Sequence, residues 1–149
     1  MSNQIKIRVR LIIPHENKLL LEYVEGEDFY FYPGGKVEFG ETLLLACKRE
    51  MVEELGVKFV LKKILYIRDF LKLEKDEHSV EFFILGEINK SVVEKNPDDP
   101  DYKEHHRFEW VEIDKLAEKE IFPKELTPKL IADFKAGFLN QGEYLGAIE

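Results

Sequence analysis

The sequence predicts a mixed α/β (α+β) fold, a single domain in which a mixed β-sheet lies between helices. Short segments of alternating apolar and polar residues are typical of half-buried strands. Two other segments repeat apolar residues at the spacing of amphipathic helices. The 149 residues fit one ordinary domain, and nothing requires a second one within residues 1–149. Because helices interrupt the series of strands, we expect one mixed sheet covered on both faces.

Three strands are predicted before the first helix. In residues 5–13, Ile, Val and Leu alternate with Lys and Arg, which indicates a half-buried strand. Residues 14–17 form a turn and residues 18–24 return as a strand, so we expect these two strands to pair as a hairpin. Residues 29–32 form a short aromatic strand that ends at Pro33-Gly34-Gly35.

Residues 41–55 have the apolar periodicity of a helix, and Gly56 stands where a helix C-terminus is usually closed. A second amphipathic helix is predicted by the spacing of Leu126, Leu130, Ile131, Phe134 and Phe138. The other elements expected after the first helix are strands at residues 57–73 and 79–88, a long surface loop at 89–103, a strand at 107–113, a short helix from Asp114, the second amphipathic helix from Glu125, and a loose tail at 142–149.

The charge of the chain restricts its partners. Asp and Glu number 30 against 22 Lys and Arg, which gives a formal net charge of −8. Proteins that bind nucleic-acid polymers usually carry a basic stripe that neutralises phosphates, and this sequence has none. We therefore expect no nucleic-acid polymer as partner. A divalent cation can still bridge an acidic protein to a phosphorylated small molecule.

Three features predict a cytoplasmic protein without a membrane partner. Cys47 is the only cysteine, which excludes an intramolecular disulfide and favours a reducing compartment. Residues 1–6 lack the apolar segment of a secretory signal. No segment approaches the roughly 18 consecutive apolar residues of a membrane span. A homodimer through a strand edge or the N-terminus is compatible with the sequence, but no residue pattern requires one.

The acidic residues of the first helix are arranged for chemistry. On a helix, Glu50, Glu53 and Glu54 share one face over an arc of about 100°. The neighbouring face is apolar and predicts a stripe packed on the core, formed by Leu44, Cys47, Met51 and Leu55. Like charges at this spacing repel by a few tenths of a kcal/mol, a penalty that a bound divalent cation removes. Carboxylate ligands favour Mg²⁺, with Mn²⁺ as a substitute.

The glycines before this helix add a second element. Pro33-Gly34-Gly35 allows the backbone to approach a ligand closely, so a main-chain carbonyl can join the metal shell. The same glycines leave space for phosphate oxygens.

Residues 35–57 match a known pattern in full, G-x5-E-x7-R-E-U-x-E-E-x-G-U, where U is a bulky apolar residue. The matching residues are Gly35, Glu41, Arg49, Glu50, Met51, Glu53, Glu54, Gly56 and Val57. Seven fixed residues would coincide by chance about once in 10⁹ starting positions. Met51 is a less common choice at its apolar position. The segment therefore resembles the Nudix box, the metal-binding signature of the Nudix hydrolase family, and the order of elements around it is similar to the family's α/β/α sandwich.

The resemblance implies a role for each residue of the box. Glu50, Glu53 and Glu54 would hold the metal, and any one of them could activate water. The carbonyl of Gly34 would complete the metal shell. The structural supports would be Gly35, Gly56 and a salt bridge between Glu41 and Arg49, with Glu41 near a metal in some members. The implied reaction is attack of water on a nucleoside diphosphate linked to a moiety X, with Mg²⁺ as the cofactor.

Residues outside the box are weaker candidates. The family often adds a fourth carboxylate, for which we choose Glu104; Glu81 is the alternative, and an exposed acid of no function is an equally good interpretation of Glu104. His78, His105 and His106 are better interpreted as ordinary surface or strand histidines than as a metal group. Of the aromatic residues 29–32, alternation allows at most two to stack on a nucleobase.

The predicted function is therefore an Mg²⁺-dependent pyrophosphohydrolase acting on a small nucleotide. A nucleoside triphosphate or an oxidised nucleotide is the first expectation for the substrate, and ADP-ribose or a nucleotide sugar is the second. A nucleotide-binding Nudix module without catalysis is the main alternative, although such modules usually carry degenerate boxes. A purely structural acidic domain explains neither the glycines nor the spacing of the carboxylates.

Overall fold

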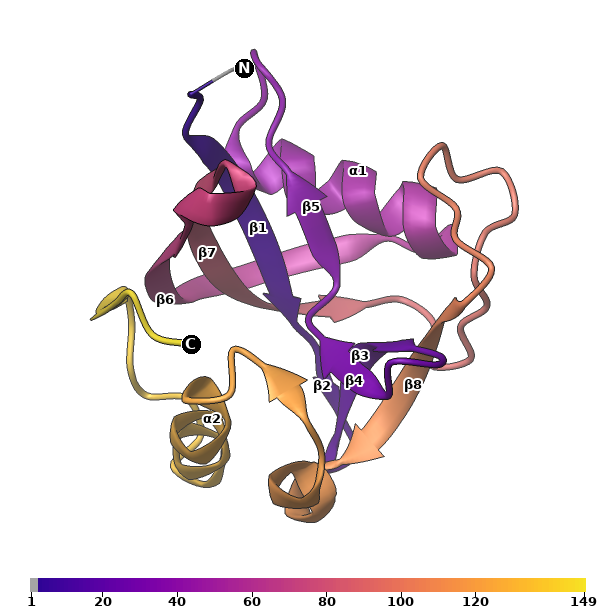
Figure 1. Ribbon diagram of the computed structural model, residues 1–149. Coiled ribbons are helices and arrows are strands. Elements are labelled where there is room, and N and C mark those ends of the chain that lie inside the picture. The colour runs from indigo at the N-terminus through magenta and orange to yellow at the C-terminus, as the bar shows by residue number, and fades with distance from the viewer. Residues whose placement is uncertain (1–2) are drawn as a thin grey trace.

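The computed structural model describes residues 3–149, which fold into two β-sheets with helices on the outside (Figure 1). In chain order the elements are β1 (Lys6–Ile12), β2 (Pro14–His15), β3 (Lys18–Val24), β4 (Phe29–Phe31), β5 (Gly34–Lys36), α1 (Leu43–Leu55), β6 (Phe59–Lys72), the 3₁₀ turn η1 (Leu73–Lys75), β7 (Glu77–Ile88), β8 (His106–Glu112), the 3₁₀ helix η2 (Ile113–Glu118), β9 (Ile121–Phe122), α2 (Leu126–Lys135) and β10 (Glu143–Gly146). The predicted mixed α+β class is confirmed.

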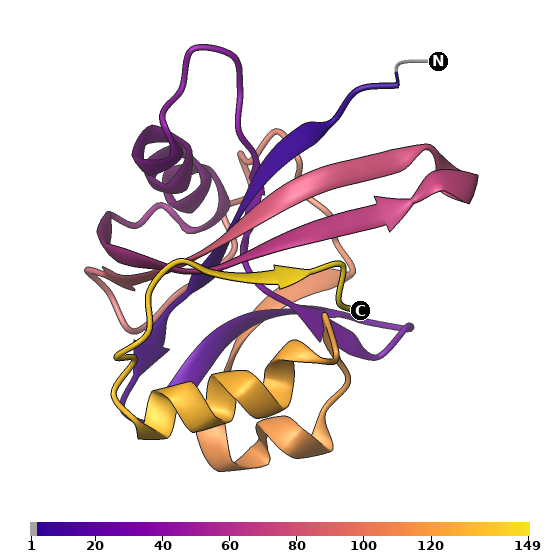
Figure 2. The same ribbon diagram turned by 90° about the vertical axis from the view of Figure 1, so that its left-hand side faces the viewer.

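The expectation of one sheet is wrong, because the strands divide into two. The first sheet has the order β10-β6-β7-β1-β5 and contains both parallel and antiparallel pairs. The second has the order β2-β3-β4-β9, with β8 also paired to β3. In Figure 2, α1 covers the outer side of the first sheet, while α2 and η2 lie at the opposite end of the molecule.

The predicted hairpin between residues 5–13 and 18–24 is much shorter than expected. Only the two residues of β2 pair with β3, across the turn residues Glu16 and Asn17, whose φ values are 48° and 62°. Such positive values at both positions are typical of two-residue hairpin turns. The longer β1 pairs instead with β7 and β5. Alternation identifies a strand but does not select its partner, which is why the sequence did not reveal this change of sheet.

Helix α1 ends at Leu55 as predicted but begins at Leu43, two residues after the predicted start. The Oγ1 of Thr42 accepts a hydrogen bond from the amide of Leu45 at 3.1 Å, which caps the N-terminus. Gly56, with φ of 64°, closes the C-terminus through bonds from its amide to the helix carbonyls. Cys47 and the rest of the expected stripe are buried against the first sheet, except that Leu44 is exposed and Ala46 is buried instead. Burial raises the pKa of the Cys47 thiol to about 12.

The C-terminal region differs from the predicted loose tail. Residues Glu143–Gly146 form β10, which pairs in parallel with β6. Helix α2 ends at Lys135, so the predicted helical residue Phe138 lies beyond it. The Phe138 side chain is nevertheless buried, and its ring centre lies 5.9 Å from that of Phe134. Strand β5 was also not predicted, because its two glycines have a low strand propensity and the strand forms only by pairing with β1.

Residues 1 and 2 lie outside the described residues. They belong to the predicted domain and to the N-terminal segment that lacks a secretory signal. Within residues 3–149, no helix has both the length and the apolar character needed to cross a bilayer.

The packing of α1 gives a stability prediction with a control on the same helix. Met51 is fully buried, whereas its neighbour Val52 is 54% exposed. Met51→Ala should lower the free energy of unfolding by about 2–5 kcal/mol, because it leaves a cavity in a closed core. Val52→Ala should change it by less than about 0.5 kcal/mol. Urea denaturation of both variants measures the two values, and equal effects would contradict the described packing.

Candidate active site

Arg49 is the centre of an ion-pair network that joins α1 to the loop before it. Its Nε and Nη2 atoms donate to the two carboxylate oxygens of Glu41 at 2.6 and 2.9 Å. Its Nη1 donates to Glu50 at 2.9 Å and to Glu53 at 3.2 Å, and its Nη2 also reaches the carbonyl of Lys36 at 2.9 Å. The salt bridge expected between Glu41 and Arg49 is therefore present, and one planar guanidinium orients two of the box carboxylates.

The Glu41 end of this network holds the loop. One Glu41 oxygen also accepts a hydrogen bond from the backbone amide of Glu38 at 2.9 Å, which closes the turn between β5 and α1. The hydrogen bond from Arg49 lowers the pKa of Glu41, and the same contact raises the pKa of Arg49. Both groups are thus held in their charged forms, as a structural brace requires.

Glu50 is a buried carboxylate that packs directly on a glycine. Its side chain extends from α1 to β5, and only 7% of the residue is exposed. A Cβ atom placed on Gly35 would lie 2.4 Å from Oε1 of Glu50 and 2.6 Å from its Cδ. No side chain fits between them, so the position next to Glu50 must be glycine for the carboxylate to keep this place.

Gly34 places its backbone carbonyl at the same edge of the first sheet, on β5. Its φ is 141°, and a Cβ there would lie 2.0 Å from the carbonyl oxygen of Val9 on β1, so only glycine is accepted. In an antiparallel pair, alternate residues direct their backbone groups away from the partner strand. Lys36 does so and meets Arg49 on α1. The same alternation directs the carbonyl of Gly34 away from β1 along this free edge.

Glu54 and Glu22 bring two carboxylates together from different elements. Oε2 of Glu54 is buried and has no hydrogen-bond partner among the described residues. Burial raises the pKa of Glu54 well above its usual value, and the charges of Glu22 and Glu50 raise it further. Glu22, on β3, accepts a hydrogen bond from Nδ1 of His106 at 2.7 Å. Burial raises the pKa of Glu22 as well, although His106 opposes the shift.

Glu22 was not predicted as a site residue, although the sequence contains a signal for it. It is the acidic residue of β3, whose neighbours Leu19, Leu20 and Leu21 are all buried. An acid that follows three buried leucines in a strand is unusual in a core position and often marks a site. Its proximity to Glu54 depends on the pairing of the second sheet, which local sequence does not specify.

Glu53 lies at the outer side of the cluster, next to the long loop. Burial raises its pKa, and Arg49 opposes this shift. The side-chain amide of Asn96 donates to the carbonyl of Glu53 at 2.9 Å, and the Asn96 backbone amide donates to the carbonyl of Glu54 at 2.8 Å. The loop predicted at residues 89–103 thus binds the C-terminal end of α1 and satisfies two carbonyls that the helix leaves free.

Among the described residues, neither of the two candidates for a fourth carboxylate makes a recorded contact with the box. Glu104 is exposed in the loop before β8. Glu81 is buried on β7, where it pairs with Arg10 at 2.9 Å and with Arg68 at 3.0 Å. The structure records no contact of either carboxylate with the three box glutamates within residues 3–149. Glu22 is the additional carboxylate whose charge acts on Glu54, and the role of Glu104 stays a prediction.

The candidate histidines and aromatic residues differ in where they lie relative to the box and in their exposure. His105 is exposed and His78 lies on the first sheet away from the box, whereas His106 pairs with Glu22. Of the aromatic residues 29–32, Tyr30 and Tyr32 are buried in the core. Phe29 and Phe31 remain partly exposed, which agrees with the limit of two stacking candidates set by alternation.

The donor set fits a hydrated divalent cation rather than a closed protein cage. Within residues 3–149, no three His, Cys, Asp or Glu side chains are arranged as a ready cage for a metal ion. The unpartnered Oε2 of Glu54, the buried Glu50 and the Gly34 carbonyl are all oxygen donors along one edge. Mg²⁺ keeps several waters and is usually held by one or two carboxylates together with substrate phosphates, so this incomplete set is suitable for it.

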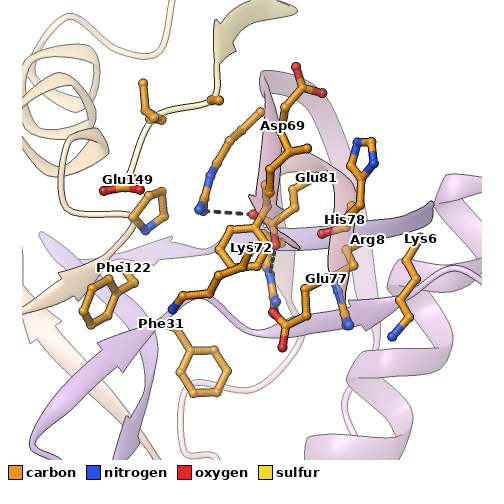
Figure 3. A pocket seen from close by; sticks show the side chains of 18 of the residues that line it. Lys6, Arg8, Phe31, Asp69, Lys72, Glu77, His78, Glu81, Phe122 and Glu149 are labelled. Carbon is orange, nitrogen blue, oxygen red and sulfur yellow. Dashed lines mark hydrogen bonds and ion pairs between the residues drawn. The ribbon is translucent and has the colours of Figure 1, made fainter. Parts of the chain in front are cut away.

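A cavity of about 870 Å³ opens between the two sheets (Figure 3), and neither Glu22 nor the three box glutamates line it. The guanidinium of Arg10, which lines it, lies 5.9 Å from the centre of the Phe31 ring. Phe31 in turn meets the His106 ring edge-on at 5.7 Å, and His106 pairs with Glu22. A continuous line of contacts therefore connects the cavity with the carboxylates beside α1.

Comparisons with solved structures agree with the fold. Three similar solved structures are a UDP-X diphosphatase (TM-score 0.68, 18% identity, 96% of this chain and 68% of that chain covered), a NUDIX hydrolase from Nitrosomonas europaea (0.68, 24%, 90% and 90%) and an ADP-ribose pyrophosphatase from Streptococcus suis (0.67, 18%, 95% and 99%). At these identities the likeness shows the fold. The comparison of the sequence with curated proteins found no match.

The family is shown by a separate comparison with the sequence itself. The model of the NUDIX domain matches residues 8–130, which include most of β1, the whole of the box at residues 35–57 and the start of α2. Because this match spans most of the chain, and because the fold and the carboxylate cluster agree with it, the chain belongs to the Nudix family of hydrolases.

Proposed function

We propose that this Nudix hydrolase cleaves a phosphoric anhydride bond in a nucleoside diphosphate linked to a moiety X, and that the reaction depends on Mg²⁺. Nudix hydrolases generally use divalent cations and act on small nucleotides. The observation that supports the proposal most strongly is the buried Oε2 of Glu54, which faces the charges of Glu22 and Glu50 without a partner among the described residues. A buried acid repelled by other acids is expensive unless a cation lies between them.

Each residue of the cluster has a proposed task. The carboxylates of Glu50, Glu53 and Glu54 and the carbonyl of Gly34 would hold the cation, with Glu22 as an additional acid on the opposite side. When bound, Mg²⁺ supplies neutralisation of phosphate oxygens and activation of a water molecule. One of the three box carboxylates would accept the proton of the attacking water. Arg49 is the positioning residue, because it orients Glu50 and Glu53 through hydrogen bonds of 2.9 and 3.2 Å.

Two substrate classes remain in the proposal. A nucleoside triphosphate or an oxidised nucleotide is the first. The second, ADP-ribose or a nucleotide sugar, is favoured by a specific observation, the cavity of about 870 Å³ between the two sheets, which contacts through Phe31 and His106 link to Glu22. A volume in the range of roughly 300–1,000 Å³ accommodates a drug-sized group. A single terminal phosphate needs a much smaller volume. The similar structures named an ADP-ribose pyrophosphatase and a UDP-X diphosphatase support the same class.

The proposal extends to the setting of the enzyme. The intact box argues against a binding module without catalysis. We propose a cytoplasmic enzyme whose partner is a small nucleotide, without a nucleic-acid polymer or a membrane as partner; a homodimer stays a prediction from the sequence.

The carboxylates can be tested by neutral, isosteric changes. Glu53→Gln and Glu54→Gln should each lower kcat by about a hundredfold or more, because a cation ligand or proton acceptor is lost. The assay uses Mg²⁺ with a panel containing a nucleoside triphosphate, an oxidised nucleotide, ADP-ribose and a nucleotide sugar, and it identifies both products. EDTA should abolish turnover.

The control for these variants is Glu118→Gln, which changes an exposed acid on η2. It should keep full activity, and the thermal melting of all three variants should resemble that of the parent protein. Full turnover of both box variants, or turnover that survives EDTA, would contradict the proposal.

The glycine beside Glu50 gives a second test. Gly35→Ala places a methyl group 2.4 Å from Oε1 of Glu50, so the carboxylate must move. A displacement of about 1 Å in a catalytic group can cost about a hundredfold in rate, and we expect a loss of this order in kcat. Gly26→Ala is the control, because a Cβ at this position would meet no atom within 4 Å. The φ of Gly26 is 90°, so alanine would strain the backbone there. It should lower stability without lowering kcat, and a Gly35→Ala enzyme with normal kcat would refute the described packing.

A further inference from the structure

The floor of the inter-sheet cavity carries three arginines around one buried carboxylate, which pairs with two of them. In the first sheet, Glu81 on β7 lies between Arg8 on β1 and Arg68 on β6, each directly opposite it in the strand register. Arg10 is two residues further along β1, on the same face as Arg8. Glu81 is only 4% exposed and pairs with Arg10 at 2.9 Å and with Arg68 at 3.0 Å. All four residues line the cavity, and Figure 3 labels Arg8 and Glu81 among them.

The positive charge at this floor is not balanced. Arg8 is half-buried, and no carboxylate lies within ion-pair distance of it in the part of the chain that the structure describes, residues 3–149. Arg68 is 6% exposed, and its buried Nε has no hydrogen-bond partner among these residues. Burial lowers the pKa of both Arg8 and Arg68, and repulsion from Arg10 lowers them further. The one buried carboxylate, Glu81, therefore pairs with Arg10 and Arg68, and Arg8 stands without an ion pair among the described residues.

The acids at the rim of the cavity do not replace the missing partner. Glu74, Glu77 and Glu149 are exposed, so water screens their charges. Asp69 accepts a hydrogen bond from the hydroxyl of Tyr144. Buried guanidinium groups without a partner are costly, and charge-assisted hydrogen bonds to an anion remove that cost. A second unpartnered group, the hydroxyl of Tyr32, is buried in the same wall and can also donate a hydrogen bond.

We infer that this floor binds an anionic group, a phosphate or a carboxylate, carried by the moiety X beyond the diphosphate that is cleaved. The donors are the guanidinium of Arg8 and Nε of Arg68, while Arg10 and Arg68 hold Glu81 in place. The ring of Phe31, which lies next to Arg10 and His106, forms the wall between this site and the carboxylates beside α1. The assignment of the anion to the substrate rests on the proposed function, whereas the anion site itself does not.

The anion site can be tested without any turnover. The chain has only five arginines, Arg8, Arg10, Arg49, Arg68 and Arg107, so their Nε–H signals can be followed individually by ¹⁵N NMR. EDTA-treated protein is titrated with glucose 6-phosphate, glucuronate and glucose, three ligands that share a sugar and differ in charge. We expect saturable shifts of the Arg8 and Arg68 signals with at least one of the two anions and none with glucose. The anion that binds more tightly distinguishes a phosphate from a carboxylate on X.

The matched variants are Arg8→Gln and Lys90→Gln. Arg8→Gln should weaken binding of the anion by about tenfold or more, because a charge-assisted hydrogen bond is lost. Lys90→Gln removes an exposed charge outside the cavity and should leave binding unchanged. Equal binding of glucose and the anions, no saturable shift with either anion, or an Arg8→Gln protein that binds as well as the parent would overturn the inference.

Failure of the inference is distinguishable from failure of the proposed function. Glu53→Gln should lose turnover but retain anion binding in EDTA. Arg8→Gln should retain the Mg²⁺ requirement and lower kcat/KM by about tenfold for substrates with an anionic X, such as UDP-glucuronate, relative to UDP-glucose. An unchanged ratio between these two nucleotide sugars in a parent enzyme that hydrolyses both would also count against the anion site.

Discussion

The arrangement of the active site depends on one guanidinium group. Arg49 makes hydrogen bonds to Glu41 in the loop, to Glu50 and Glu53 on α1, and to a carbonyl of β5. Without it, the acids on this face of the helix would repel one another and the loop would lose its attachment. A single planar donor with five N–H groups can satisfy carboxylates in several directions, which lysine cannot do. The site is therefore organised before any cation or substrate is present.

Buried charge distinguishes two regions of the molecule. Beside α1, Glu22, Glu50 and Glu54 form a site with excess negative charge, which suits a cation. Across the Phe31 ring, Arg8, Arg10 and Arg68 form a floor with excess positive charge. A nucleotide with a cation on its diphosphate and an anionic group at a distance complements both regions. The division follows from strand alternation, because Val9 and Leu11 of β1 face α1, whereas Arg8 and Arg10 face the cavity.

Local signals in the sequence predicted the parts of the fold that depend on local interactions. Gly56 predicted the C-terminal end of α1, and helical geometry placed Glu50, Glu53 and Glu54 on one face, whereas the N-cap at Thr42 was not predicted. The partners of strands were not predictable in this way: the division into two sheets, β5 and β10 all depend on residues distant in sequence. Glu22 was missed for the same reason. The Lys and Arg residues of β1 were interpreted as the polar side of a half-buried strand, but they line a cavity because a second sheet faces them.

The most direct test of this account is the effect of Arg49 on cation binding. Free Mn²⁺ is measured by electron paramagnetic resonance during titration of the parent protein and of Arg49→Gln. If Arg49 acts only through its charge, removing that charge should tighten the binding of a cation. If it positions Glu50 and Glu53, its loss should weaken Mn²⁺ binding by about tenfold or more, as is typical when a group that orients metal ligands is removed. Equal or tighter binding by Arg49→Gln would contradict the account.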